Sequence, residues 1–213
     1  IGPSPNPNMR RVYVLARNSV THNTYIAPSE NPYVAYADFN ADMLEMGTPL
    51  VWSYTSIPEM NWWNHQTDWR RPFHAITTDN MGNVYYAGYH FATQSDGTTD
   101  IPEADLDVFV CPNYGQGTWS RVAEFSNLPS WNPPAQPGGI DGYFTDSDTG
   151  MSYTDDQLFW AIGNSSHLNA VCDSQGRVHV MGIWSLHNSE GSYYPSFQTV
   201  KSFIYDPSDQ SFT

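Results

Sequence analysis

The sequence predicts an all-β protein. Short runs that alternate polar and apolar residues, or that are rich in β-branched and aromatic residues, recur along the chain, whereas sustained helical periodicity is almost absent. The 16 prolines and 15 glycines divide the chain into short segments. One hairpin pattern also occurs twice, which indicates a fold built from a repeated unit.

The strands expected from these runs are bounded by Gly, Pro, Asn, Asp and Ser residues, which favour turns. They occupy positions 11–17, 33–39, 49–54, 73–78, 83–90, 106–111, 118–125, 158–162, 168–172, 177–184 and 200–206. Helix signals are weak in every segment. No apolar run approaches the ~18 residues that a membrane-spanning helix requires, so membrane insertion is not expected.

The repeated hairpin joins two strands through the pattern Asp-x-x-Gly-x-Val. The first copy, from His74 to Gly88, reads HAITTDNMGNVYYAG, and the second, from His167 to Gly182, reads HLNAVCDSQGRVHVMG. The Asp, Gly and Val residues have the same spacing in both copies. We expect the Asp carboxylate to bind nearby backbone amides and the Gly to adopt a positive φ.

A second hairpin follows each copy, so each unit has four antiparallel strands, as in the blade of a β-propeller. In the first unit, 33–39 is the expected second strand. The sequence thus predicts a partial β-propeller of about three four-stranded blades. Known propellers usually need at least four blades to close, so the chain is expected to be a fragment, or to need missing sequence or another chain to complete the ring. The blade-like units lie at about 11–54, 73–125 and 167–213, with a long insertion at 126–166.

The segment from Asn113 to Trp119 (NYGQGTW) resembles the Asp-box, or BNR repeat, of sialidase-like propellers. In that family a Ser-x-Asp-x-Gly-x-Thr-Trp turn joins the last two strands of a blade. Here Cys111 replaces the Ser, Asn113 replaces the Asp, and one residue is inserted before the Thr-Trp pair. The repeated hairpin is similar to hairpins in BNR-type propellers of secreted bacterial proteins, some of which degrade polysaccharides. The resemblance implies a fold and an extracellular or cell-surface location far more than an activity.

The connections between the expected strands fall into two sets. In an up-and-down blade, the turns from the first to the second strand and from the third to the fourth lie on one face, and the other connections lie on the opposite face. Long loops without regular structure are usually functional, so a binding face is expected on the side of the long connections. The short set is 79–82, 112–117, 173–176 and 207–210, and the long set is 55–72, 91–105, 126–166 and 185–199.

Aromatic and charged residues that suit sugar stacking or protein contact gather in or beside the long connections. His74 and His167 open equivalent strands near the expected channel, where an imidazole suits a general base or a sugar hydrogen-bond partner. In the alternative interpretation, the rings only pack the loops onto the propeller and the histidines bond backbone groups between blades. The candidate ligand-binding residues are Trp62, Trp63, His65, Trp69, Arg70, Arg71, His74, His90, His167, His187 and Tyr193.

Acidic loops suggest a metal site at one place in the chain. Asp146, Asp148 and Asp155 form an oxygen-rich group that suits calcium, and a solvated acidic loop is the alternative. Asp107 and the acids from Asp96 onward are interpreted as a similar oxygen-rich loop. No cofactor other than calcium is expected.

The chain carries 8 Lys+Arg against 22 Asp+Glu, a formal net charge of −14. This balance repels nucleic-acid phosphates and anionic membrane surfaces, so neither is an expected partner. Cys111 and Cys172 are expected to be free thiols, and a disulfide between them is the alternative.

The expected function is that of a secreted or cell-surface binding module that recognises carbohydrate or a protein partner through its long loops. A component of a larger surface or secretion assembly is a further possibility. The alternative is a carbohydrate-active enzyme, either a glycoside hydrolase or a polysaccharide lyase, since a lyase needs a histidine or tyrosine base with an arginine. The sequence contains no Gly-x-Ser-x-Gly motif, phosphate-binding loop or dinucleotide fingerprint.

Overall fold

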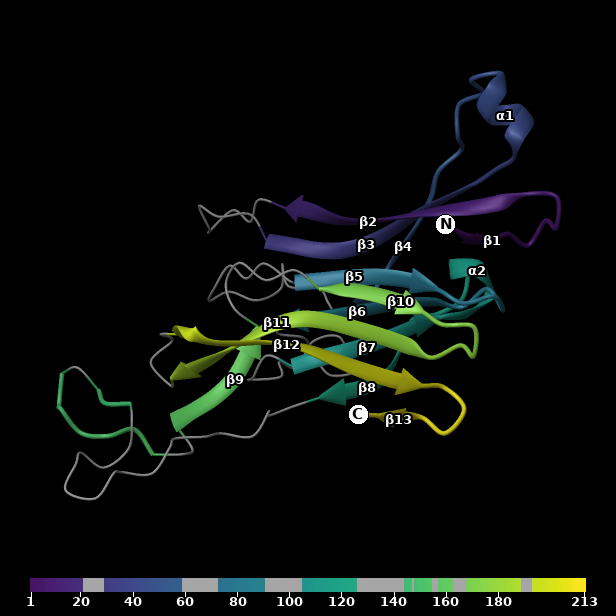
Figure 1. Cartoon of the computed structure of the whole chain (residues 1–213). Coiled ribbons are helices and arrows are strands. Elements are labelled where there is room, and N and C mark those ends of the chain that lie inside the picture. Colours follow the sequence, from purple (N-terminus) through teal and green to yellow (C-terminus); the bar gives the residue numbers. More distant parts are fainter. Residues whose placement is uncertain are drawn as a thin grey trace.

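The structure is a computed structural model of the 213-residue chain, and its strands form three antiparallel sheets (Figure 1). The prediction of an all-β fold is confirmed, and the described strands do not close into a barrel. None of the helices in the described part has the length and apolarity to cross a membrane. The structure describes residues 1–20, 29–58, 73–90, 105–125, 144–146, 148–154, 157–162, 168–188 and 193–213.

Sheet 1 has four strands that pair in chain order, namely β1 (Gly2–Pro3), β2 (Arg10–Val20), β3 (Ser29–Phe39) and β4 (Ser53–Ser56). A short helix, α1 (Ala41–Glu45), lies between β3 and β4. Asn40 caps its N-terminus, and the Asn40 side chain accepts a hydrogen bond from the Met43 N–H at 2.9 Å. The prediction that 33–39 is the second strand of this unit is wrong, because β1 precedes β2 and makes β3 the third strand.

Sheet 2 also pairs in chain order and closely matches the predicted strands. Its members are β5 (Phe73–Thr78), β6 (Val84–His90), β7 (Asp105–Cys111) and β8 (Ser120–Phe125). The short segment α2 (Pro112–Gly115) joins β7 to β8. Within it, Asn113 and Tyr114 have left-handed φ angles of 55° and 59°.

Sheet 3 pairs β10, β11, β12 and β13 in order, and β9 joins the edge of β11 that β10 also uses. The insertion predicted at 126–166 therefore contributes a strand to this sheet. The loop predicted at 185–199 is wrong, because β11 and β12 cover nearly all of it. The bounds are β9 (Leu158–Ile162), β10 (Asn169–Cys172), β11 (Val178–Asn188), β12 (Tyr193–Asp206) and β13 (Ser211–Phe212).

The repeated hairpin has the same turn in sheets 2 and 3, as predicted. In each copy the Asp Oδ1 accepts hydrogen bonds from the backbone N–H groups two and four residues later. The distances are 2.9 and 2.8 Å at Asp79, and 2.9 and 3.0 Å at Asp173. The turn glycines, Gly82 and Gly176, have φ angles of 88° and 85°. One local sequence pattern thus builds the same turn twice.

The turn in sheet 3 leads to a prediction about ionisation. Asp173 Oδ2 lies 3.0 Å from His179 Nε2 and 2.8 Å from Arg177 Nε. The His179 hydrogen bond, followed by the bonds from Arg177, lowers the pKa of the Asp173 carboxyl. An NMR titration should therefore give Asp173 a pKa well below the ordinary aspartate value of about 3.9, and His179→Phe should raise it. The same substitution should leave the pKa of Asp38 unchanged, because Arg11 is the residue that binds the Asp38 carboxylate. An ordinary pKa for Asp173 in the unsubstituted protein would contradict this assignment.

Sheet 2 is the middle layer and is buried on both faces. On β6, Val84 and Tyr86 pack toward sheet 1, whereas Tyr85 and Ala87 pack toward sheet 3. All four are at most 3% exposed. Burial on both faces explains why this strand is almost continuously apolar instead of alternating.

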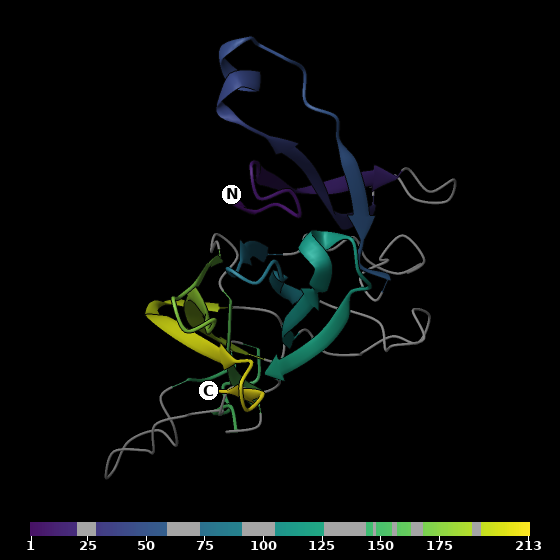
Figure 2. The same cartoon turned by 90° about the vertical axis from the view of Figure 1, so that its right-hand side faces the viewer.

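The first strands of the three sheets lie next to one another. The Cys172 N–H in β10 donates a hydrogen bond to Thr77 Oγ1 in β5 at 3.1 Å. On the other side of β5, a Cβ atom added to Gly2 of β1 would lie 2.5 Å from Thr78 Oγ1. Figure 2 views the molecule from the end at which β1, α1 and α2 lie, and shows the three sheets side by side.

The two cysteines are free thiols, as predicted. Cys111 is buried between sheets 1 and 2, and burial raises the pKa of its thiol to about 11. Cys172 is half-buried.

Candidate functional site

The two ends of the sheets differ in how the strands are joined. We call one the turn end, and its connections are 4–9, 40–52, 79–83, 112–119, 173–177 and 207–210. The four short turns predicted for one side all lie there. The 40–52 connection also lies at the turn end and is longer because it holds α1. The long connections are therefore not confined to the opposite end. At that opposite end, the connection end, the strands begin or stop at Val20, Ser29, Ser56, Phe73, His90, Asp105, Phe125, Leu158, Asn188 and Tyr193.

Most of the predicted ligand-binding residues belong to segments that leave the connection end. His90 ends β6 and Tyr193 begins β12, so the backbone places both at this end, although their side chains are not among those described. The segment 59–72 connects the described residues that follow β4 with Phe73, the first residue of β5. The predictions that lie outside the described residues are those for Trp62, Trp63, His65, Trp69, Arg70, Arg71 and His167.

His74 lies in β5 near the connection end, at the boundary between sheets 1 and 2. Its Nδ1 is 3.5 Å from the hydroxyl of Tyr86, and the two rings meet edge to face with centroids 5.8 Å apart. Tyr86 is fully buried and packs toward sheet 1. His74 itself is half-buried, so its imidazole can both be held by the protein and meet a ligand.

Asp107 is a buried acid that the sequence placed both in the expected strand 106–111 and in an oxygen-rich loop. It lies inside β7 and is 1% exposed, so the strand is confirmed and the loop interpretation is wrong. Its Oδ1 forms an ion pair with Arg121 Nη1 at 3.5 Å. Burying a carboxylate is costly unless a positive or hydrogen-bonding partner accompanies it. The Arg121 guanidinium also lies over the ring of Phe109, 5.3 Å from its centroid.

These residues share the face of sheet 2 that is directed toward sheet 1. The register pairs His74 with Gly88 and Gly88 with Asp107, so the imidazole and the carboxylate flank a residue without a side chain. We call His74, Tyr86, Asp107 and Arg121 the polar group. Two of its members, His74 and Arg121, retain solvent exposure and can exchange hydrogen bonds with a hydroxyl-rich or anionic ligand. The buried pair, Tyr86 and Asp107, can hold them in place. A charged residue inside an apolar strand, as in LDVFVC, is the signal that could have identified Asp107.

His187 occupies β11 instead of a long loop. Its Nε2 lies 3.0 Å from Ser185 Oγ, and burial lowers the pKa of the imidazole by disfavouring its charged form. A neutral histidine beside a serine has the residue types of a base and a nucleophile. Ser185 is 0% exposed, however, so no substrate reaches its hydroxyl in this arrangement.

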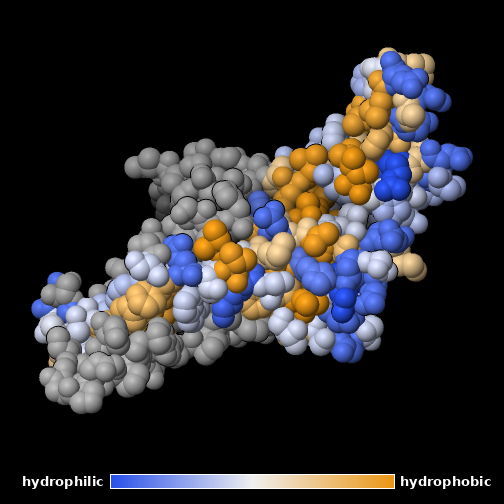
Figure 3. All heavy atoms as spheres, viewed as in Figure 1, coloured by the Kyte–Doolittle hydropathy of each residue, from blue (hydrophilic) through white to orange (hydrophobic). Residues whose placement is uncertain are grey.

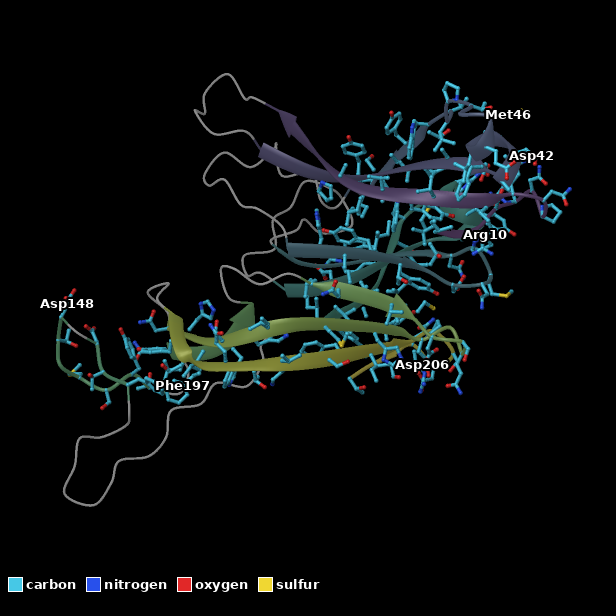
Figure 4. All side chains as sticks on the ribbon, turned by 45° about the horizontal axis from the view of Figure 1, so that its top comes forward. Arg10, Asp42, Met46, Asp148, Phe197 and Asp206 are labelled. Atoms are coloured by element: carbon cyan, nitrogen blue, oxygen red, sulfur yellow. The ribbon has the colours of Figure 1, made fainter. Side chains whose placement is uncertain are left out.

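The aromatic residues near β12 pack against one another. The Phe144 ring lies 4.5 Å from the ring of Tyr194 and 5.0 Å from that of Phe197, measured between centroids. Asn188 Nδ2 donates a hydrogen bond to the Tyr153 hydroxyl at 2.9 Å. Tyr194 and Phe197 thus fit the alternative interpretation, in which aromatic rings pack a connecting segment onto the sheet. Figure 4 shows Phe197 and Asp148 together at the end opposite Asp206.

The calcium prediction concerns the segment that follows Phe144. Asp146 Oδ1 accepts hydrogen bonds from the N–H groups of Asp148 and Thr149, at 2.7 and 3.1 Å, as in an ordinary Asx turn. Asp155 lies outside the described residues. In the described part of the chain, no three His, Cys, Asp or Glu side chains form a group that could hold a metal ion.

Comparison with known proteins gives no match to this chain among family models, curated proteins or solved structures.

Proposed function

We propose that the protein is a β-propeller binding module that recognises carbohydrate at its connection end. The observation that carries this proposal is the position of His74 next to Phe73, the strand end that leads into the tryptophan-rich segment 59–72, on the same face of sheet 2 as the ion pair of Arg121 and Asp107. Sugar sites combine aromatic faces for stacking with a few fixed polar groups. This end of the molecule offers both kinds of residue.

The propeller part of the proposal is supported by the arrangement of the sheets. Each contains a four-stranded antiparallel meander, and their first strands β1, β5 and β10 lie next to one another. In a propeller, the sheets pack face to face, and their first strands lie next to one another around the central axis. The proposed location, extracellular or at the cell surface, rests on the resemblance of the 113–119 segment to the Asp-box.

The test is glycan binding by the full chain. On a glycan array the protein should bind at least one class of oligosaccharide, and isothermal titration should then give the affinity for the best glycan. We expect His74→Ala to weaken that affinity at least roughly tenfold, about 1.4 kcal/mol. His179→Ala is the matched control, since His179 is also half-buried but lies at the turn end, and it should leave the affinity unchanged.

Two results would overturn the proposal. Binding to no glycan on the array would favour a protein partner, the other ligand class that the aromatic segment suits. Equal losses for His74→Ala and His179→Ala, with circular dichroism unchanged, would remove the site from the connection end.

A carbohydrate-active enzyme is the second candidate, favoured by the polar group itself. Because His74 contacts Tyr86 and Arg121 pairs with Asp107 on the same face, an imidazole, a phenol and a guanidinium share one part of sheet 2. These are the residue types of a base and a charge-neutralising partner in polysaccharide cleavage. Release of new chain ends from a bound polysaccharide, abolished by His74→Ala, would establish this candidate over the binding module.

A further inference from the structure

The two outermost sheets each expose an apolar face. On sheet 3, Met181 and Ile183 of β11 are 43% and 42% exposed, and Val171 and Val200 on the flanking strands are 53% and 71% exposed. The register places Val200 opposite Ile183. We call this set of four residues the outer face of sheet 3. Figure 3 shows hydrophobic atoms gathered at the surface over β11 and β12.

Sheet 1 has a comparable surface on its far side. The register aligns Val14, Ala35 and Tyr54 in one row across β2, β3 and β4. Val14 is 43% exposed and Tyr54 is 66% exposed, whereas Ala35 between them is 7% exposed. We call this row the outer face of sheet 1.

The internal repeat shows what each outer face is built to contact. Val84 and Val178 hold the same place in the repeat, and each is fully buried against the preceding sheet. By the same alignment Met181 corresponds to Ala87, which is fully buried against the following sheet. The outer face of sheet 3 therefore repeats a surface that packs on a following sheet. The outer face of sheet 1 is, in turn, the side that would receive a preceding sheet.

We propose that these two faces pack on each other between two copies of the chain, so that sheet 3 of each copy covers sheet 1 of the other. The faces cannot meet within one copy, because sheet 2 separates them (Figure 1). The contact is head-to-tail, and a two-fold arrangement satisfies both faces of both copies at once. Three sheets from each copy then make a ring of six, within the 4–8 blades typical of propellers.

Charge supports the same pairing. Figure 4 places Arg10 of β2 and Asp206 of β12 at the turn end, on the two outermost sheets. If the stack continues as it does between sheets 1, 2 and 3, turn ends stay beside turn ends. Exposed Arg10 of one copy then approaches the acidic turn of the other, where Asp206 and Asp209 lie.

The test is the mass of the full chain in solution, by size exclusion with light scattering at micromolar concentration. We expect twice the 24.0 kDa of one chain. Val200→Glu and Val14→Glu, one on each face, should each raise the dissociation constant at least roughly tenfold. Met81→Glu is the matched control, because Met81 is 81% exposed in the turn between β5 and β6, away from both faces, and should leave the mass unchanged.

Several outcomes would overturn the inference. The mass of one chain would show that something other than a second copy covers the faces, and species that keep growing with concentration would show that the contact does not close. A dimer lost with Val200→Glu but kept with Val14→Glu would indicate a contact between like faces. Far-UV circular dichroism separates these results from unfolding of a variant. The inference rests on the proposed propeller arrangement, and a monomer that binds glycan would refute the pairing while leaving the binding function intact.

Discussion

Gly82→Ala should destabilise the protein by about 3 kcal/mol or more in urea denaturation. Two costs add at this position. The φ angle of 88° is left-handed, which costs an L-residue roughly 1–2 kcal/mol. The new Cβ would also lie 2.5 and 2.6 Å from ring carbons of Tyr114, and overpacking of this kind costs about 1–3 kcal/mol. The ring cannot move away easily, because the Tyr114 N–H is bonded to the Gly82 carbonyl at 2.7 Å and its carbonyl accepts from Arg11.

Gly176→Ala is the matched control for this prediction. Gly176 holds the same place in the repeat and has nearly the same φ, 85°, but its nearest neighbour to an added Cβ is Pro207 Cγ at 4.0 Å. Only the conformational cost applies, so the expected loss is about 1 kcal/mol. Equal losses for the two variants would show that Tyr114 does not close over Gly82.

The repeated turn could be predicted from sequence because its cause is local. The Asp carboxylate binds N–H groups within four residues, and the glycine supplies the positive φ, so five consecutive residues determine the conformation. The strands of sheet 2 were predicted for a similar reason. They are short runs of β-branched and aromatic residues between turn formers, and both faces are buried.

Elements that depend on distant partners could not be predicted in this way. β1 is only Gly2–Pro3, which has no strand propensity and is a strand because it pairs with Arg10 and Arg11. β12 was expected to begin near 200, yet it begins at Tyr193 because β11 continues beside it after a shift in register between Ser185 and Leu186. In both cases the pairing partner, and not local composition, decides the structure.

The candidate site shows the same limit. His74 was identified because it opens a repeated strand. The strand that contains Asp107 was predicted, but nearby acids suggested an oxygen-rich loop, and only the pairing of β7 with β6 and β8 shows that Asp107 is buried beside Arg121. The tryptophan-rich segment remains a prediction from sequence, and its role is tested by glycan binding.

Arg11→Met should lower the free energy of unfolding by about 3 kcal/mol at neutral pH, because it removes the hydrogen bonds through which Arg11 joins sheets 1 and 2. Arg11 is 3% exposed, and its guanidinium donates to both Asp38 oxygens at 2.7 and 2.6 Å and to the Tyr114 carbonyl at 2.7 Å. It also lies 4.6 Å from the centroid of the Tyr36 ring. Removing one partner of a buried pair typically costs 3–5 kcal/mol. We expect a loss at the lower limit of this range, because the Asp38 side chain is 27% exposed and its carboxylate can be hydrated when Arg11 is absent.

The double variant Arg11→Met with Asp38→Leu separates the ion pair from simple packing. It leaves no carboxylate without its partner, so it should recover most of the stability lost in the single variant.

The stability contributed by the pair of Arg11 and Asp38 should also change with pH in a defined direction. The hydrogen bond from Arg11 is the main cause that lowers the pKa of Asp38, so the pair stabilises the fold fully above the unfolded aspartate pKa of about 3.9 and loses that contribution as the pH falls through the lower folded value. Urea denaturation at stepped pH should therefore show the advantage of the unsubstituted chain over the single variant shrinking below about pH 4. A constant difference across that range would mean that Arg11 acts through its contact with Tyr114 and its packing on Tyr36, and that the ion pair with Asp38 contributes nothing to the joining of the two sheets.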